Sequence, residues 1–172
     1  MIPVIEMQIR RFEETEKSCQ ENRPLDNLQV IRATETWQQA GAYYVRIQGM
    51  ARQHHITLRQ EFDEHDGPDT KYIVLTDDIL PIATCRFYEL DSESAMIGRV
   101  VVLPEYRGQG LGQRVMREAE KWLSDLGYTL AVIESRDVAV GFYQRLGYTV
   151  TDATILHGDT FDCIRMEKEL SQ

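Results

Sequence analysis

Apolar and polar positions recur along the chain with two periods, one typical of strands and one typical of helices. Alternation over Leu28 to Ala33 predicts a half-buried strand. From Thr34, the expected N-cap, apolar residues recur at helical spacing to about Gln53. A short second helix is expected over Leu58 to Asp66, before the turn at Gly67-Pro68. The first strand therefore leads into a helical stretch.

Three strands are predicted next, with polar turn sequences between them. They cover Lys71 to Thr76, Ile82 to Leu90 and Met96 to Leu103. Asp77-Asp78 and the segment from Asp91 to Ser94 suit hairpin turns. A meander of three neighbouring antiparallel strands is the simplest arrangement.

The remaining chain alternates helices with strands. The pattern predicts a helix over Leu111–Leu126 ended by Gly127, a strand over Thr129–Glu134, a helix over Val138–Leu146 ended by Gly147, and strands over Tyr148–Thr151 and Phe161–Lys168. Because the 129–134 strand is nearly all apolar and follows a helical crossover, we expect it inside the sheet and parallel to its neighbour. The order of elements predicts an α/β (α+β) fold with a mixed, mainly antiparallel sheet flanked by helices.

Length and charge limit the classes of function. A chain of 172 residues suits one domain, which we place at residues 28–172 after a helical extension and linker at residues 1–27. The formal net charge of -9 argues against a nucleic-acid partner. No apolar run approaches the roughly 18 residues of a membrane helix, and the first eleven residues lack the order of a signal peptide, so we expect a cytoplasmic protein without a membrane partner.

The metal-ligating residue types are scattered. Cys19, Cys85 and Cys163 are odd in number and widely spaced, which favours free thiols over a disulfide framework or a zinc site. The four histidines also have no metal-site spacing. We therefore expect no bound metal.

The densest chemical signal is a glycine-rich turn that joins the strand ending near Leu103 to the helix beginning near Leu111. A helix N-terminus exposes unpaired N–H groups, and glycines let the backbone approach a phosphate closely. A Walker loop would need Lys and Ser or Thr after Gly112, and a dinucleotide fingerprint would need glycine where Gln113 stands. Both are excluded, which leaves an Arg-x-x-Gly-x-Gly pattern from Arg107 to Gly112.

This pattern resembles the acyl-coenzyme A pyrophosphate loop of the GNAT N-acetyltransferase superfamily. The segment from Ala139 to Tyr148 resembles the later GNAT motif, in which an alanine stands four residues before a tyrosine and a Gly-aromatic pair follows the helix. Segments 61–66, 97–100 and 166–170 resemble the small ElaA-like members. The resemblance covers roughly residues 28–170. It implies a GNAT-like fold and an acetyl-CoA-dependent N-acetyltransferase that acts by direct transfer in a ternary complex.

The resemblance also implies which residues form the site. The backbone of one strand, which would splay from its parallel neighbour, would bind the pantetheine arm, and the glycine-rich turn would bind the pyrophosphate. The implied cofactor-binding residues are Val100, Val101, Val102, Arg107, Gly108, Gln109, Gly110, Leu111 and Gly112. The N–H of Val102 would face the thioester oxygen. Tyr143 would be the general acid, since an ordinary phenol can protonate a departing thiolate.

Several alternatives stay open. Tyr143 either acts as this acid or packs with Phe142 on the apolar stripe of its helix. The general base is unknown, although Glu134 could act directly or through water. Arg136 stands where the superfamily often has asparagine, so the acceptor chemistry is open. Transfer to a hydroxyl is a weaker possibility, and a non-catalytic acyl-CoA-binding regulatory module is the alternative of a different class.

The acceptor is expected to be a primary amine of a small molecule or peptide. Between Glu61 and Asp91 nine acidic residues stand against two basic ones. Such a segment either steers cationic amines toward the site or supplies ordinary turn and surface residues. A homodimer is also possible, since helix and strand edges in this kind of sheet often pair.

Overall fold

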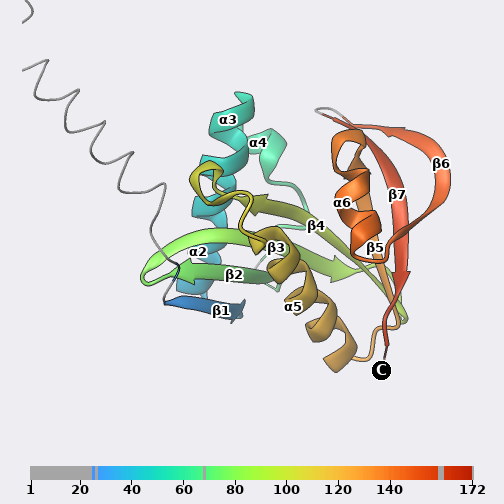
Figure 1. The fold of residues 1–172 in the computed structure, drawn as a ribbon, viewed down its shortest axis with the longest axis horizontal. Helices are drawn as coiled ribbons and strands as arrows, with labels where there is room; N and C mark the ends of the chain where they lie inside the picture. Colours follow the sequence, from blue (N-terminus) through green and yellow to red (C-terminus); the bar gives the residue numbers. More distant parts are fainter. Residues whose placement is uncertain (1–24, 26, 68, 159–160, 172) are drawn as a thin grey trace, which may run out of the picture.

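The computed structural model of the chain describes residues 25, 27–67, 69–158 and 161–171. Within them, one seven-stranded sheet runs in the order β1-β2-β3-β4-β5-β7-β6 (Figure 1). Its strands are β1 (Leu28–Ala33), β2 (Lys71–Asp77), β3 (Leu80–Glu89), β4 (Ser94–Val102), β5 (Leu130–Arg136), β6 (Thr149–His157) and β7 (Asp162–Glu169). The helix expected within residues 1–27 falls on positions outside the described residues.

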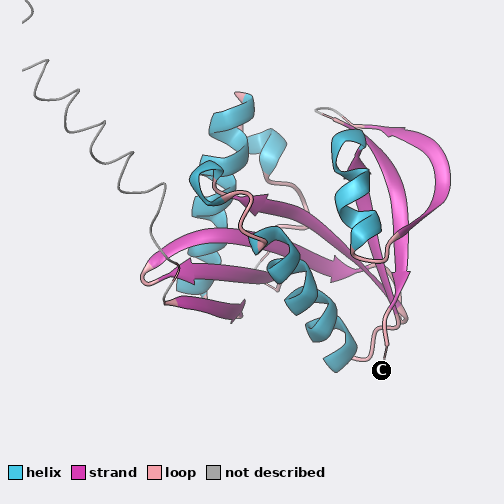
Figure 2. Cartoon of the chain, viewed as in Figure 1, coloured by secondary structure: helices cyan, strands magenta, loops and turns pink. Residues whose placement is uncertain are grey.

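Helices flank this sheet (Figure 2). They are α2 (Thr36–Arg46), the π-helical turn η1 (Ile47–Ala51), α3 (Arg52–His54), α4 (Leu58–Glu61), η2 (Pro104–Tyr106), α5 (Leu111–Asp125), η3 (Asp137–Ala139) and α6 (Val140–Arg145). Strands β2, β3 and β4 form the predicted antiparallel meander, and β5 is parallel to β4. The predicted fold class is therefore confirmed. None of the helices in the described segments is long and apolar enough to cross a membrane.

The sheet carries a core on each face because its central strands alternate between them. On β2, Ile73 and Leu75 belong to the large core cluster that contains the apolar side of α5. Tyr72 and Val74 pack instead with Ala42 of α2. Burial on both faces makes β2 a nearly continuous apolar strand, and it fixes α2 and α5 on opposite sides of the sheet.

The first helices differ from the predicted ones. Helix α2 is capped by Glu35 instead of Thr34, because Glu35 and Gln38 form a reciprocal capping box. The expected helix to residue 53 is interrupted by the π-helical turn η1. The second helix ends at Glu61 instead of Asp66, since the chain after it turns inward to place carboxylates against buried arginines.

The wedge between β4 and β5 is the feature that positions the site. These strands pair only over residues 94–96 and 130–132. Beyond that point β4 contains a bulge. Gly98 and Val101 are three positions apart on β4, but their partners Arg86 and Thr84 are only two positions apart on β3. Arg99 at the bulge has a φ of 50°. The divergence expected at Val100 to Val102 is thus present, and a bulge with a left-handed residue accompanies it.

Candidate functional site

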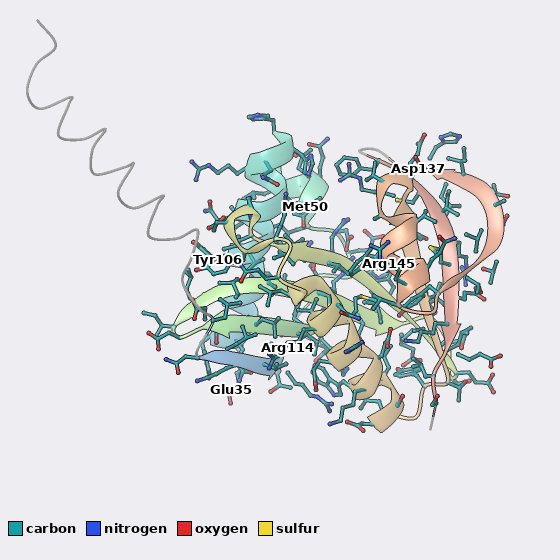
Figure 3. The ribbon with its side chains drawn as sticks, in the orientation of Figure 1. Glu35, Met50, Tyr106, Arg114, Asp137 and Arg145 are labelled. Carbon is teal, nitrogen blue, oxygen red and sulfur yellow. The ribbon has the colours of Figure 1, made fainter. Side chains whose placement is uncertain are left out.

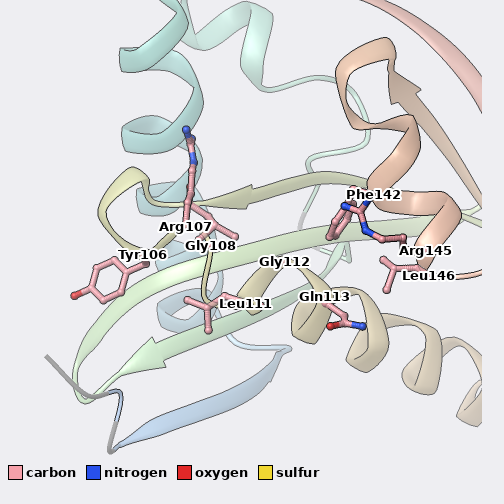
Figure 4. A pocket seen from close by; sticks show the side chains of 11 residues that line it. Tyr106, Arg107, Gly108, Leu111, Gly112, Gln113, Phe142, Arg145 and Leu146 are labelled. Carbon is pink, nitrogen blue, oxygen red and sulfur yellow. The ribbon is translucent and has the colours of Figure 1, made fainter. Parts of the chain in front are cut away.

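A cleft of about 470 Å³ opens between the glycine-rich turn, the first turn of α5 and the side of α6 (Figure 4). It is lined by Val102, Tyr106, Arg107, Gly108, Gly110, Leu111, Gly112, Gln113, Phe142, Arg145 and Leu146. Six of the predicted cofactor-binding residues are in this set. The other three, Val100, Val101 and Gln109, are not; the side chain of Val101 packs instead in a small core cluster with Val45 and Leu103.

The glycines of the turn have the conformations that the motif suggests. Gly108 and Gly110 have φ angles of 79° and 76°, which residues with a Cβ rarely adopt. Gly110 is the N-cap of α5, and because glycine has no side chain, the N-cap residue offers no cap hydrogen bond to the first N–H groups of the helix. A Cβ at Gly112 would lie 3.4 Å from the ring of Phe142, so glycine lets α5 and α6 approach. The exposed N–H groups at the start of a 15-residue helix therefore face the cleft as an anion-binding end.

The backbone of Val102 points into the wedge. The N–H of Leu103 donates to Ile82 O at 2.9 Å, on the β3 side. Since successive residues of a strand direct their N–H and C=O groups to opposite edges, those of Val102 point toward the divergence from β5. The carbonyl of Val102 accepts a hydrogen bond from Arg107 Nε at 3.1 Å, which agrees with this orientation.

Arg107 braces the turn. Besides its bond to the Val102 carbonyl, its Nη2 donates to Gln53 Oε1 at 2.7 Å. Figure 4 shows this side chain extending toward the helical segment before α4, away from α6. Arg145, which the sequence analysis did not single out, lines the cleft from α6 on the other side (Figures 3 and 4). The guanidinium most available to an anion in the cleft is therefore that of Arg145.

Tyr143 packs against the main core and is not among the residues that line either cleft. Its ring meets Phe142 at 4.9 Å and Tyr148 at 5.9 Å, edge to face in both cases. Its hydroxyl has no hydrogen-bond partner among the described residues. Burial, with smaller contributions from Cys85 and Cys163, raises the pKa of Tyr143 well above its ordinary value. The phenol is therefore a weaker acid than the ordinary one expected from the sequence.

A second cleft of about 750 Å³ borders the same wedge. Its lining includes Arg99 on β4, Glu134 on β5 and Cys163 on β7, together with the segment around α4 and the β6–β7 turn. The full set is Thr57, Arg59, Gln60, Phe62, Asp63, Glu64, Arg99, Glu134, Gly158, Phe161 and Cys163. Glu134 is the candidate base named from the sequence, and it lies in this cleft.

Buried ion pairs fix the α4 wall of the second cleft. They join three arginines to three carboxylates, namely Arg46, Arg86, Arg99, Glu61, Asp63 and Asp66. Arg46 is fully buried and lies 2.7 Å from Glu61. Arg86 binds Asp63 through two hydrogen bonds of 2.7 and 2.9 Å. With three charges of each sign the network is neutral, so these acids supply no net negative field.

Two other acidic residues of the 61–91 segment, Asp91 and Glu89, make structural hydrogen bonds. Asp91 accepts hydrogen bonds from the N–H and the hydroxyl of Ser94 in its hairpin. Glu89 accepts one from the hydroxyl of Tyr128 at 3.0 Å. The acids whose contacts the structure defines therefore serve the fold. This favours the interpretation of the segment as ordinary turn and surface residues over the steering of cationic amines.

Comparison with known proteins places these features in a family. The model of the acetyltransferase (GNAT) family matches residues 25–148. A crystal structure of an inferred N-acetyltransferase from Lactobacillus plantarum is 30% identical, with a TM-score of 0.79 over 84% of this chain and 99% of that one. Escherichia coli ElaA is 20% identical, with a TM-score of 0.70 over 83% and 99%. An uncharacterised N-acetyltransferase of Bacillus subtilis, YjcF, is 27% identical over 72% of this chain and 86% of its own length.

Proposed function

The chain belongs to the acetyltransferase (GNAT) family and is an N-acetyltransferase, and from this premise we propose that it moves an acetyl group from acetyl-CoA to a primary amine by direct transfer in a ternary complex. The observation that carries the proposal is the placement of two clefts on one strand divergence. Val102 lines the first cleft and Arg99 the second, and both belong to β4. Two substrates bound in these clefts would meet beside β4 and β5.

The residues of the first cleft fit acetyl-CoA, which would supply the reactive acetyl thioester. The glycine turn offers backbone N–H groups and the positive end of α5 to a diphosphate. Arg145 adds a cation from α6, while Arg107 holds the turn against Val102 and Gln53. The outward N–H of Val102 would donate to the acyl oxygen and stabilise developing negative charge.

Two side chains are proposed to move protons. Glu134 lines the second cleft and has no hydrogen bond or ion pair within the described residues, so its carboxylate is free to take a proton from the acceptor ammonium, directly or through water. Tyr143 keeps its proton near neutral pH as an ordinary phenol does, and burial raises its pKa further, which makes it a weaker acid. Its hydroxyl is the proposed donor to the leaving sulfur.

Calorimetry and a thiol-release assay test this function. Titration of coenzyme A into the protein should give saturable heat, and Gly110→Val should weaken the affinity about tenfold or more because valine resists a φ of 76°. Gly98→Ala, which adds a Cβ in open space on β4, is the control. A primary amine should then release coenzyme A thiol from acetyl-CoA. Saturable binding without amine-dependent release across an amine library would indicate a binding module instead.

The assignment of residues 1–27 to a separate extension, the homodimer and the cytoplasmic location stay predictions. Deletion of residues 1–24 followed by the same thiol-release assay would show whether the N-terminal segment contributes to turnover. Light scattering of the purified full-length protein would give its mass in solution. These measurements are independent of the transfer chemistry.

A further inference from the structure

The second cleft has three charged side chains outside the arginine–carboxylate network, one guanidinium and two carboxylates. Asp63 and Arg99 are bound to each other at 3.0 Å, and Asp63 is also bound to Arg86. In the part of the chain that the structure describes, neither Arg59 nor Glu134 has a hydrogen bond or an ion pair. Both line the cleft. A ligand therefore meets one available guanidinium, that of Arg59, and two carboxylates, that of Glu134 and that of Glu64, whose nearest charged partner is His65 at 4.0 Å.

Arg59 and Glu134 stand on different walls of the cleft. Glu134 is on β5, two residues beyond the last residue paired with β4, so it lies where the wedge opens. Arg59 is on α4, the segment that the buried ion network anchors through Glu61. An amine that reaches the wedge is thus nearer to the Glu134 wall, and the rest of the molecule extends toward the Arg59 wall. Glu64, with its side chain 83% exposed, is at the rim.

Aromatic rings add an apolar surface to the same cleft. Phe62 and Phe161 both line it, and each is covered on one side by an arginine. Arg46 lies over Phe62 at 4.3 Å, and Arg136 lies over Phe161 at 3.9 Å. These contacts fix the rings and leave them as walls for an apolar body. They also place a second cation, Arg136, beside the cleft.

We infer that the acceptor is an amino-carboxylate, a small molecule that carries a primary amine and a carboxylate on an apolar body. This inference rests on the proposed function and adds the substrate class. Glu134 binds the ammonium group and Arg59 binds the carboxylate, which a guanidinium can hold with two parallel hydrogen bonds. A polyamine is disfavoured because it would bring a second positive charge toward Arg59 and Arg136.

Matched pairs of amines test the inference. Thiol release from acetyl-CoA is measured with phenylalanine against phenethylamine, and with lysine against 1,5-diaminopentane. The member with the carboxylate should have a kcat/KM about tenfold higher or more. Arg59→Gln should remove this preference by raising KM for the amino acid, while KM for acetyl-CoA and kcat/KM for phenethylamine stay within about twofold. Arg117→Gln, an exposed change on α5, is the matched control and should keep the preference.

The outcomes distinguish a wrong acceptor class from a failure of acetyl transfer itself. If decarboxylated amines react as well or better, or if Arg59→Gln leaves the preference in place, the inference is wrong and acetyl transfer to amines stands. If coenzyme A binds but no amine of either set releases thiol, the transfer function itself fails and the acceptor class falls with it. Titration of phenylalanine into the protein saturated with coenzyme A should give heat that Arg59→Gln abolishes, and equal heat in both proteins would contradict the role of Arg59.

Discussion

Tyr143 is the side chain for which we propose a chemical role in addition to packing. Its ring is held edge to face by Phe142, which lines the first cleft, and by the buried Tyr148. Cys163, whose thiol contributes to the raised pKa of Tyr143, lines the second cleft. The ring therefore has one neighbour in the lining of each cleft, although Tyr143 itself lines neither. A raised pKa makes it a weaker acid, but one that keeps its proton across the neutral range.

Replacement of Tyr143 by phenylalanine separates these two roles. The ring contacts remain, so the fold and the affinity for coenzyme A should stay within about twofold, while kcat should fall about 100-fold because the proton donor is lost. Steady-state kinetics and calorimetry measure the two effects. Tyr128→Phe, which removes a hydroxyl bound to Glu89 at the surface, is the control. An unchanged kcat in Tyr143→Phe would show that the residue only packs.

At the scale of elements, buried charge holds α4 in place. Asp66 is almost fully buried and accepts hydrogen bonds from Arg46 and from the hydroxyl of Tyr72. Burial alone would raise the pKa of Asp66, but these hydrogen bonds outweigh it and hold the pKa well below its ordinary 3.8. Because the folded carboxyl resists protonation more than the unfolded one, its stabilisation is complete above about pH 4 and is lost as the pH falls further.

Asp66→Asn should remove this pH dependence together with the stability. At pH 7 the variant should unfold with a free energy about 3 kcal/mol lower, since Arg46 and Arg86 lose a buried partner. Between pH 4 and pH 2 its stability should fall less steeply than that of the wild type. Urea unfolding at stepped pH measures both effects, with the exposed Asp69→Asn as control. Parallel pH profiles for wild type and Asp66→Asn would contradict the assignment.

The π-helical turn η1 brings the first helical stretch against the diverging strand. A Cβ at Gly49 would lie 2.5 Å from Cγ1 of Val101, which is closer than real side chains approach. Gly49→Ala should therefore lower the free energy of unfolding by about 1–2 kcal/mol and raise KM for acetyl-CoA, because β4 must shift. Chemical unfolding and kinetics of the variant test this. A variant as stable as the wild type, with the same KM, would show that the contact does not position β4.

Local signals of the sequence were sufficient for some elements and insufficient for others. Gly127 and Gly147, with φ angles of 95° and 93°, end their helices as predicted, because a helix end depends on neighbouring residues. The ion network was not predicted, since its partners, such as Arg46 and Asp66, are 20 residues apart and meet only in the fold. The left-handed bulge at Arg99 and the place of Arg145 in the first cleft also depend on tertiary contacts.

At the scale of the whole molecule, the two clefts have different walls. The first is walled by α5 and α6, and the second by α4, β5 and β7. The proposed ternary complex requires both substrates to be bound at once, and two clefts on one wedge would allow this. Covalent transfer through the protein would need a nucleophile there, and Cys163 is the cysteine in the second cleft. Burial and the nearby Glu134 raise the pKa of Cys163, which disfavours the reactive thiolate.

Direct transfer therefore predicts a kinetic pattern and a tolerant cysteine. Double-reciprocal plots against the amine at several acetyl-CoA concentrations should intersect, because both substrates must be present before the thiol is released. Cys163→Ser should keep kcat within about twofold of the wild type. Incubation with acetyl-CoA alone should leave the mass of the protein unchanged. Parallel lines, an acetylated protein that an amine discharges, or loss of turnover in Cys163→Ser would indicate an acyl-enzyme, because only that route needs a nucleophile between the two clefts.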